Sequence, residues 1–78
     1  MYTVYILKCF DGKLYIGCTK NLKERLIRHN NGYIPATKNR LPTKLITFIV
    51  FNDKYKAFRF EKYLKSGSGR AFISKHFI

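Results

Sequence analysis

The chain has 78 residues and a formal net charge of +12, because 16 Lys and Arg residues stand against 4 Asp and Glu. This length predicts one domain, residues 1–78, with a small core, since chains of this size bury only about 60% of their unfolded surface. The basic residues are spread along the whole chain, which favours a folded surface that binds polyanions, nucleic acid first among them. A solvated basic surface without a partner is the alternative.

Targeting and membrane signals are not expected. The first residues carry no basic region followed by an apolar core, so they do not resemble a signal peptide. The longest apolar run, 45–51, is far too short to span a bilayer. Cys9 and Cys18 lack the further Cys or His pair that a zinc site needs, so we expect free thiols and a cytoplasmic location.

The first two elements form a predicted hairpin. Strands are expected over 2–9 and 13–18, with the turn sequence Phe-Asp-Gly at 10–12 between them. A two-residue loop would direct the Tyr5 and Tyr15 side chains to opposite faces, because side chains alternate along a strand. We predict the three-residue loop instead, with a left-handed glycine at its third position.

The longer loop brings the two phenols together. It pairs Tyr5 with Gly17 and Leu7 with Tyr15. Both tyrosines then share one face as diagonal neighbours, with their Cα atoms roughly 7–8 Å apart. Gly17 would then leave a gap beside Tyr5 that a phosphate group could enter.

A helix is predicted next, over 22–30. Asn21 and Glu24 have the spacing of a capping box, and Gly32 is a suitable helix terminator. His29 falls on the apolar stripe of this helix, and Arg25 borders the stripe one turn earlier.

The second half of the chain alternates irregular and regular segments. A polar loop over 31–44 precedes a strand over 45–51 that is apolar almost throughout and is therefore expected to be well buried. A helix capped by Asp53 should run to about Ser66, followed by a flexible loop over 66–69 and a short last helix over 70–77. Five aromatic residues of this region are expected in the core rather than stacked on bases: Tyr55, Phe58, Phe60, Tyr63 and Phe72.

The four acidic residues can be assigned by position. Asp11 belongs to the turn, Glu24 to the first helix cap and Asp53 to the second, which leaves Glu61 without a local role. Glu61 lies on a mostly apolar stripe, where an unpaired carboxylate is costly. It therefore pairs with a Lys or Arg, or binds a hard cation such as Mg²⁺.

Several residues in order carry a family resemblance. Val4-Tyr5-Ile6, Tyr15-Ile16-Gly17, Arg25, His29 and Glu61 together resemble the GIY-YIG nuclease domain over about residues 3–66. The resemblance implies an α+β fold, in which a three-stranded antiparallel sheet is flanked by two or three helices in the order β-β-α-β-α-α. It places the site on one face of that sheet.

The resemblance also implies the roles of five catalytic residues. Tyr5 and Tyr15 orient the scissile phosphate, and one of them helps to activate the attacking water; the sequence leaves open which one. Arg25 holds the phosphate, His29 contacts it or tunes a tyrosine, and Glu61 binds one divalent cation, Mg²⁺ or Mn²⁺. The implied activity is that of a metal-dependent endonuclease acting on DNA rather than RNA, led by structure with weak sequence selectivity.

Further residues are expected to bind the substrate. Gly17 would allow a close approach of the backbone, and four basic residues would contact the nucleic acid: Lys20, Arg28, Lys38 and Arg40.

One departure from the family pattern supports an alternative. Many members carry an asparagine about a dozen residues after the metal-binding glutamate, whereas this chain has no asparagine after Asn52. Ser66, Ser68 and Ser74 are the residues that could replace it. The alternative function is therefore a nucleic-acid-binding module that keeps the fold with little or no activity.

Overall fold

Three antiparallel strands form the sheet at the centre of the computed structural model, which describes residues 1–78. The elements follow one another as β1 (Tyr2–Lys8), β2 (Leu14–Thr19), α1 (Leu22–Asn30), β3 (Lys44–Phe51), α2 (Lys54–Leu64) and α3 (Gly67–His76). The strand order is β2-β1-β3, so β1 is central and the other two strands are edges. The predicted α+β class and the predicted element order are confirmed.

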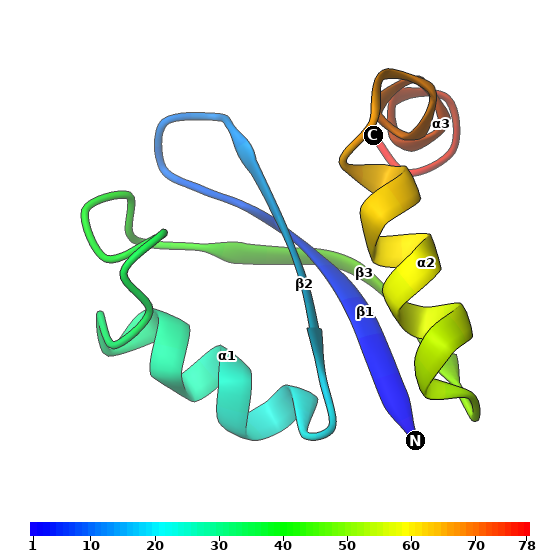
Figure 1. The fold of residues 1–78 in the computed structure, drawn as a ribbon. Coiled ribbons are helices and arrows are strands. Elements are labelled where there is room, and N and C mark those ends of the chain that lie inside the picture. Colours follow the sequence, from blue (N-terminus) through cyan, green and yellow to red (C-terminus); the bar gives the residue numbers. More distant parts are fainter.

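Helices lie on both faces of the sheet. In Figure 1, α1 lies on one side, while α2 and the α3 helix beyond its end lie on the other. The main core is between the sheet and α2 with α3, and its buried residues are Val4, Ile6, Ile16, Ala57, Leu64 and Ile73. Tyr5 and Leu7, whose side chains alternate with these along β1, are fully buried on the α1 face.

The hairpin has the predicted geometry. Its loop contains three residues, and Gly12 adopts a left-handed conformation with φ of 83°. The register pairs Tyr5 with Gly17 and Leu7 with Tyr15. Both phenols therefore lie on the α1 face, as the sequence predicted.

Strand β3 is less buried than predicted. It borders only β1, so one of its edges is open. Phe48 pairs with Tyr5 and Val50 with Thr3, which directs both side chains to the α1 face, and about half of each is exposed (49% and 48%). The apolar run reflects an edge strand with one covered face, so the prediction of a well-buried strand was wrong.

The junction between α2 and α3 also differs from the prediction. Helix α2 ends at Leu64, and α3 begins at Gly67 because the Ser66 hydroxyl accepts a hydrogen bond from the Gly69 N–H at 3.1 Å. A side chain at position 69 would collide with the backbone carbonyl of Tyr63. The predicted flexible loop at 66–69 is therefore wrong, since these residues form a cap and a first helical turn packed closely on α2.

The prediction for the five aromatic residues was only partly correct. Phe60 and Phe72 pack against the core. Tyr55, Phe58 and Tyr63 are exposed by 72%, 44% and 40%. Helical spacing alone does not decide which face of α2 meets the sheet.

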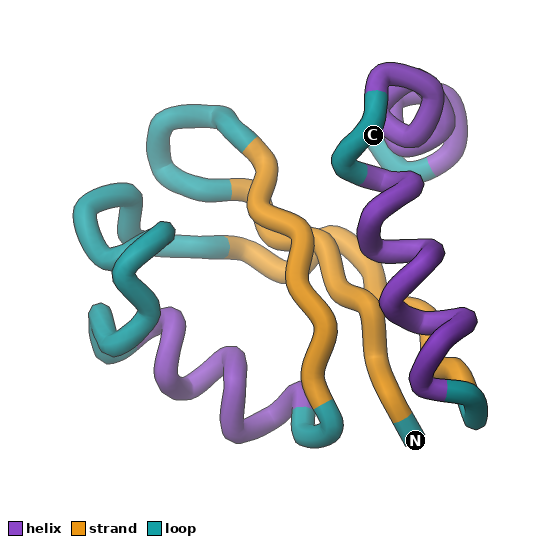
Figure 2. Tube along the Cα trace, in the orientation of Figure 1, coloured by secondary structure: helices purple, strands orange, loops and turns teal.

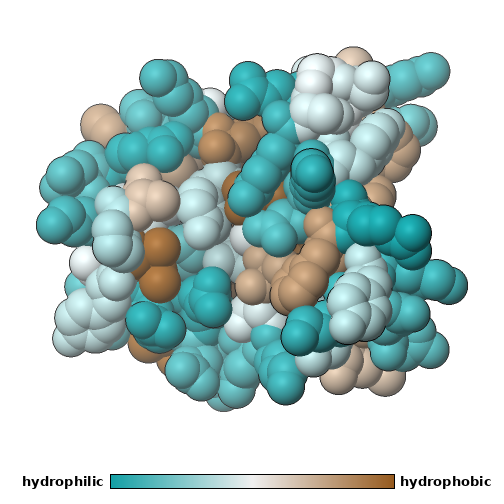
Figure 3. Space-filling model, viewed as in Figure 1, coloured by the Kyte–Doolittle hydropathy of each residue, from teal (hydrophilic) through white to brown (hydrophobic).

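Hydrophilic side chains cover most of the face drawn in Figure 3, in line with the high content of Lys and Arg. None of the helices combines the length and the apolar character that a membrane span requires.

Candidate active site

The two phenols lie side by side on the α1 face of the sheet. The ring centroids of Tyr5 and Tyr15 are 6.2 Å apart. Tyr5 lies directly over Gly17, where a Cβ atom would stand only 2.5 Å from its Cζ and Oη atoms. The predicted gap for a phosphate at Gly17 was wrong, because the Tyr5 ring itself fills that space.

A short connection from β2 positions α1. The Thr19 hydroxyl accepts a hydrogen bond from the Asn21 N–H at 3.1 Å, and the Asn21 side chain accepts one from the Glu24 N–H at 3.0 Å. The predicted Asn21 cap is confirmed, but the Glu24 carboxylate does not return the bond, because Thr19 already satisfies that N–H. The cap fixes the direction in which α1 presents Arg25 and His29.

A buried chain of hydrogen bonds links the first phenol to the loop after α1. The Tyr5 hydroxyl lies 2.8 Å from Nε2 of His29, and Nδ1 of His29 lies 2.8 Å from Oγ1 of Thr37. All three side chains are fully buried. The Thr37 hydroxyl donates to the Ile34 carbonyl at 3.5 Å, so it accepts from Nδ1–H. We therefore assign a neutral His29 whose Nε2 accepts the Tyr5 hydroxyl proton.

The electrostatics agree with this assignment. Burial lowers the pKa of His29, and the charges of Arg25 and Arg28 lower it further. Burial, together with the neighbouring Tyr15, raises the pKa of Tyr5 to about 12, against the opposing influence of Arg25. At neutral pH Tyr5 therefore holds its proton and His29 is uncharged. Tyr15, by contrast, is only half-buried.

Glu61 belongs to α2, which covers the face of the sheet opposite the tyrosines, so the expectation that the whole site lies on one face of the sheet was wrong. Its carboxylate forms an ion pair with Lys65, one helical turn later, at 3.2 Å, and its side chain is 22% exposed. Burial raises the pKa of the Cys18 thiol, Glu61 raises it further, and Arg25 lowers it. Glu61 and Arg25 are thus both near Cys18 on β2, although Glu61 makes no hydrogen bond to the phenols or to Arg25. The sequence predicted either a basic residue or a hard cation as the partner of Glu61, and the structure shows a basic residue, Lys65.

The ligands for a divalent cation are sparse. No group of three or more His, Cys, Asp or Glu residues is placed to hold a metal ion. Only one Glu61 oxygen is engaged by Lys65. A single accessible carboxylate fits a hard cation that keeps several waters, such as Mg²⁺, and it does not fit a closed protein cage.

The predicted substrate-binding residues are dispersed. Arg28 and Lys38 are exposed on α1 and on the following loop. The Lys20 ammonium lies over the Tyr2 ring, 5.4 Å from its centroid, which is the face opposite the phenols. Lys20 is therefore not brought together with the tyrosine cluster.

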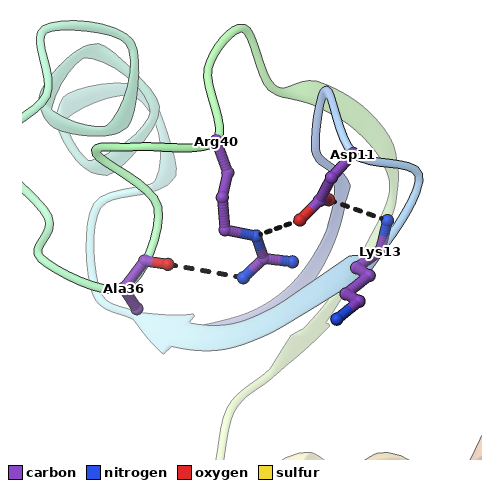
Figure 4. A network of polar contacts seen from close by, with 4 residues as sticks. All are labelled: Asp11, Lys13, Ala36 and Arg40. Atoms are coloured by element: carbon purple, nitrogen blue, oxygen red, sulfur yellow. Dashed lines mark hydrogen bonds and ion pairs between the residues drawn. The ribbon is translucent and has the colours of Figure 1, made fainter.

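Arg40 connects the loop after α1 to the hairpin turn (Figure 4). Its Nε donates to Asp11 Oδ2 at 2.9 Å, and its Nη1 donates to the Ala36 carbonyl at 3.4 Å. The N–H of Lys13, and then Arg40, hold the pKa of Asp11 below its usual range. The teal loops of Figure 2 show these two segments next to each other. Part of Arg40 is thus engaged in fixing the turn.

A groove of about 680 Å³ opens beside Tyr15, between the hairpin turn and α3. Sequence reasoning did not assign Lys13, Lys65 or Arg70 to the site, yet all three line this groove. Ser74 lines it as well, whereas Ser66 is used as a helix cap. The spacing of Lys65 from Glu61 could have identified the ion pair, because residues four apart meet on a helix.

Thr37 is the other functional residue that sequence reasoning missed. It is a single buried threonine in an irregular loop, and no periodicity marks such a position. Only the path of the loop brings its hydroxyl to His29.

A small α+β fold that gathers two phenols, an imidazole and a guanidinium beside an edge strand defines a class of nuclease-type domains. Comparison with known proteins identifies the family within this class. The family model "GIY-YIG catalytic domain" matches residues 1–74, so the chain belongs to the GIY-YIG family.

Relatives from several bacteria support this family. The chain is 47% identical over 66 residues to the UPF0213 protein CPE1444 of Clostridium perfringens, covering 83% of this chain and 71% of that one. It is 40% identical over 77 residues to the UPF0213 protein SAG0778 of Streptococcus agalactiae, covering 94% and 88%. The solution NMR structure of the UPF0213 protein BH0048 from Bacillus halodurans is similar, with a TM-score of 0.61 and 32% identity, covering 96% and 84%.

Proposed function

We propose that this protein is a metal-dependent endonuclease that hydrolyses phosphodiester bonds in DNA, guided by the shape of the substrate more than by its sequence. The observation that carries the proposal is the buried Tyr5–His29–Thr37 chain, which holds one phenol rigidly beside Tyr15 and within the influence of Arg25. A buried tyrosine needs one hydrogen-bond partner, whereas Tyr5 also has a second phenol and a guanidinium close by.

The exposed members of the cluster would contact the substrate. Arg25 and Tyr15 are only half-buried, so the scissile phosphate lies against them. Hydrolysis adds a water oxygen to phosphorus and breaks one phosphorus–oxygen ester bond. Arg25 donates N–H groups to the phosphate oxygens and stabilises the charge that gathers there.

The two phenols have different tasks in this proposal. Tyr5 is buried, holds its proton and donates it in a hydrogen bond to His29, so it supports the site without touching water. Tyr15 orients the attacking water. It first releases its own proton to solvent, and its phenolate, favoured by the nearby Arg25 cation, then accepts a proton from the water, because Tyr15 is the phenol that remains accessible. The proposal thus gives the role of the base, which the sequence left open, to Tyr15.

Glu61 would hold one divalent cation, Mg²⁺ or Mn²⁺, at the β2 edge. When bound, such an ion supplies Lewis-acid stabilisation of the developing negative charge. Lys65 releases the carboxylate readily, because an exposed ion pair of this kind contributes only about 0–1 kcal/mol.

The proposal is tested with purified protein and a panel of labelled duplex, flapped and branched DNA, with RNA counterparts, with and without Mg²⁺ or Mn²⁺. Glu61→Gln should lose metal-dependent cutting, and Arg25→Ala should lower its rate about 10²- to 10³-fold while binding persists. Glu24→Gln is the matched control, since it removes the charge of an exposed carboxylate that forms no ion pair. Equal cutting by wild type and Glu61→Gln would assign the activity to another site or to a contaminant.

The binding-module alternative has its own support. The chain lacks an asparagine after Asn52, and it offers only one carboxylate for a metal. This alternative predicts steeply salt-dependent binding with no metal-dependent product. Product formation by wild type that Glu61→Gln abolishes would exclude it.

A further inference from the structure

The groove beside Tyr15 is strongly basic. It lies between the hairpin turn and α3, which stand on either side of the upper part of Figure 1. Four cationic side chains line it together with a phenol and a hydroxyl, and no acidic residue does: Lys13, Tyr15, Arg40, Lys65, Arg70 and Ser74. Such a concentration of one charge attracts anions into the groove.

Two of these cations are free to bind a ligand. Arg40 is paired with Asp11, and Lys65 with Glu61. Lys13 and Arg70 form no ion pair in the structure, and both are exposed. Their ammonium and guanidinium groups are therefore available for charge-assisted hydrogen bonds to phosphate oxygens.

The size and floor of the groove limit what it can accept. Pockets of about 300–1,000 Å³ hold ligands of drug size, which corresponds to one or two nucleotides rather than the stacked pairs of a duplex. Leu14 and Tyr15 are half-buried and give the groove an apolar and an aromatic surface on which an unpaired base can lie, whereas Ile16 and Ile73 are buried beneath it.

We propose that this groove binds one or two unpaired nucleotides next to the phosphate held at Tyr15, with Lys13 and Arg70 on the flanking phosphates. The proposal rests on the nuclease function proposed above and specifies its substrate class. The substrate is a nucleic acid with a single-stranded segment beside the scissile bond, such as a flap, a fork or a frayed end.

Binding is measured without metal by fluorescence anisotropy, using a labelled single-stranded oligonucleotide and a blunt hairpin duplex over a range of salt. Wild type should prefer the single strand. Lys13→Ala/Arg70→Ala should bind the single strand about tenfold or more weakly. The slope of log affinity against log salt should become shallower by about 1.4, because two phosphate contacts are lost and each contributes about 0.7 for a single strand. Duplex binding should change little.

Lys56→Ala/Arg59→Ala is the matched control. It removes the same two residue types from exposed positions on α2 that do not line the groove. Equal weakening by the two double variants, or equal weakening for single strand and duplex, would overturn the proposal. Circular dichroism of both variants verifies that they are folded.

Failure of the groove and failure of the nuclease function give different results. If wild type cuts a flapped substrate with Mg²⁺ or Mn²⁺ but the groove variant binds single strands as wild type does, the groove proposal is wrong and the nuclease function stands. If the groove variant alone loses single-strand binding and no metal-dependent product forms with wild type, the groove is supported and the nuclease function is wrong.

Discussion

Replacing Tyr5 by Phe tests the buried hydrogen-bond chain most directly. The substitution keeps the ring over Gly17 but leaves Nε2 of His29 buried without a donor. An unsatisfied buried acceptor costs about 1–3 kcal/mol. We therefore expect Tyr5→Phe to lower the free energy of unfolding by that amount at neutral pH, and to lower Tm by roughly 4–8 °C for each kcal/mol.

The effect should depend on pH in a defined direction. The pKa of Tyr5 is raised to about 12 in the folded protein from 10.0, so above pH 10 the unfolded chain loses this proton first. The contribution of Tyr5 to stability is complete below pH 10 and is lost as the pH rises through about 12. Two pKa units at 1.36 kcal/mol each correspond to roughly 2–3 kcal/mol. The difference between wild type and Tyr5→Phe should therefore close at alkaline pH.

The assay is urea unfolding followed by circular dichroism, at several pH values from about 7 to about 11.5. Comparing the two proteins at each pH cancels the titration of the many lysines, which both share. Tyr55→Phe is the control, because Tyr55 is 72% exposed and should change stability by less than about 0.5 kcal/mol. A Tyr5→Phe protein as stable as wild type at pH 7, or a constant difference across the alkaline range, would refute the assigned hydrogen bond.

Three further predictions follow from packing and titration. Gly17→Ala places a methyl group 2.5 Å from the Tyr5 phenol and should lower the free energy of unfolding by about 1–3 kcal/mol in urea; unchanged stability would mean that the ring moves aside freely. Gly67→Ala faces open space and should stabilise by about 0.4–1 kcal/mol, whereas Gly69→Ala collides with the end of α2 and should destabilise by about 1–3 kcal/mol; thermal melts in the reverse order would contradict the described junction. His29 has a lowered pKa, so its contribution is complete above about pH 6.5 and is lost as the pH falls toward its folded pKa; urea midpoints between pH 7 and 5 should fall for wild type and less for His29→Gln, and parallel curves would disprove a neutral buried imidazole.

The parts of the fold that local chemistry determines could be predicted from the sequence. The register of the hairpin follows from the conformation that Gly12 allows, and the register alone brings Tyr5 and Tyr15 to one face. The placement of Arg25 and His29 follows from the spacing of one helix behind a recognisable Asn21 cap.

The parts that depend on tertiary packing could not be predicted. An apolar run such as that of β3 does not reveal whether one face or both will be covered. The glycines at 67 and 69 suggested a loop, because glycine disfavours helices, but close contact between two helices requires Gly69. Neither the groove nor its free cations Lys13 and Arg70 can be read from the sequence, since α3 reaches the hairpin turn only after the chain has folded.

The buried Thr37 hydroxyl has a consequence for anyone who re-engineers this scaffold. The segment from Asn31 to Thr43 is irregular. The residues on both sides of Thr37 are exposed, so peptides could be inserted or exchanged there. One atom in its middle, however, sets which imidazole nitrogen carries hydrogen, and that choice is transmitted to the phenol of Tyr5. A transplanted connection without a hydroxyl at this point would leave the strands and helices intact. The hydrogen bond between Tyr5 and His29 would then no longer have a fixed direction.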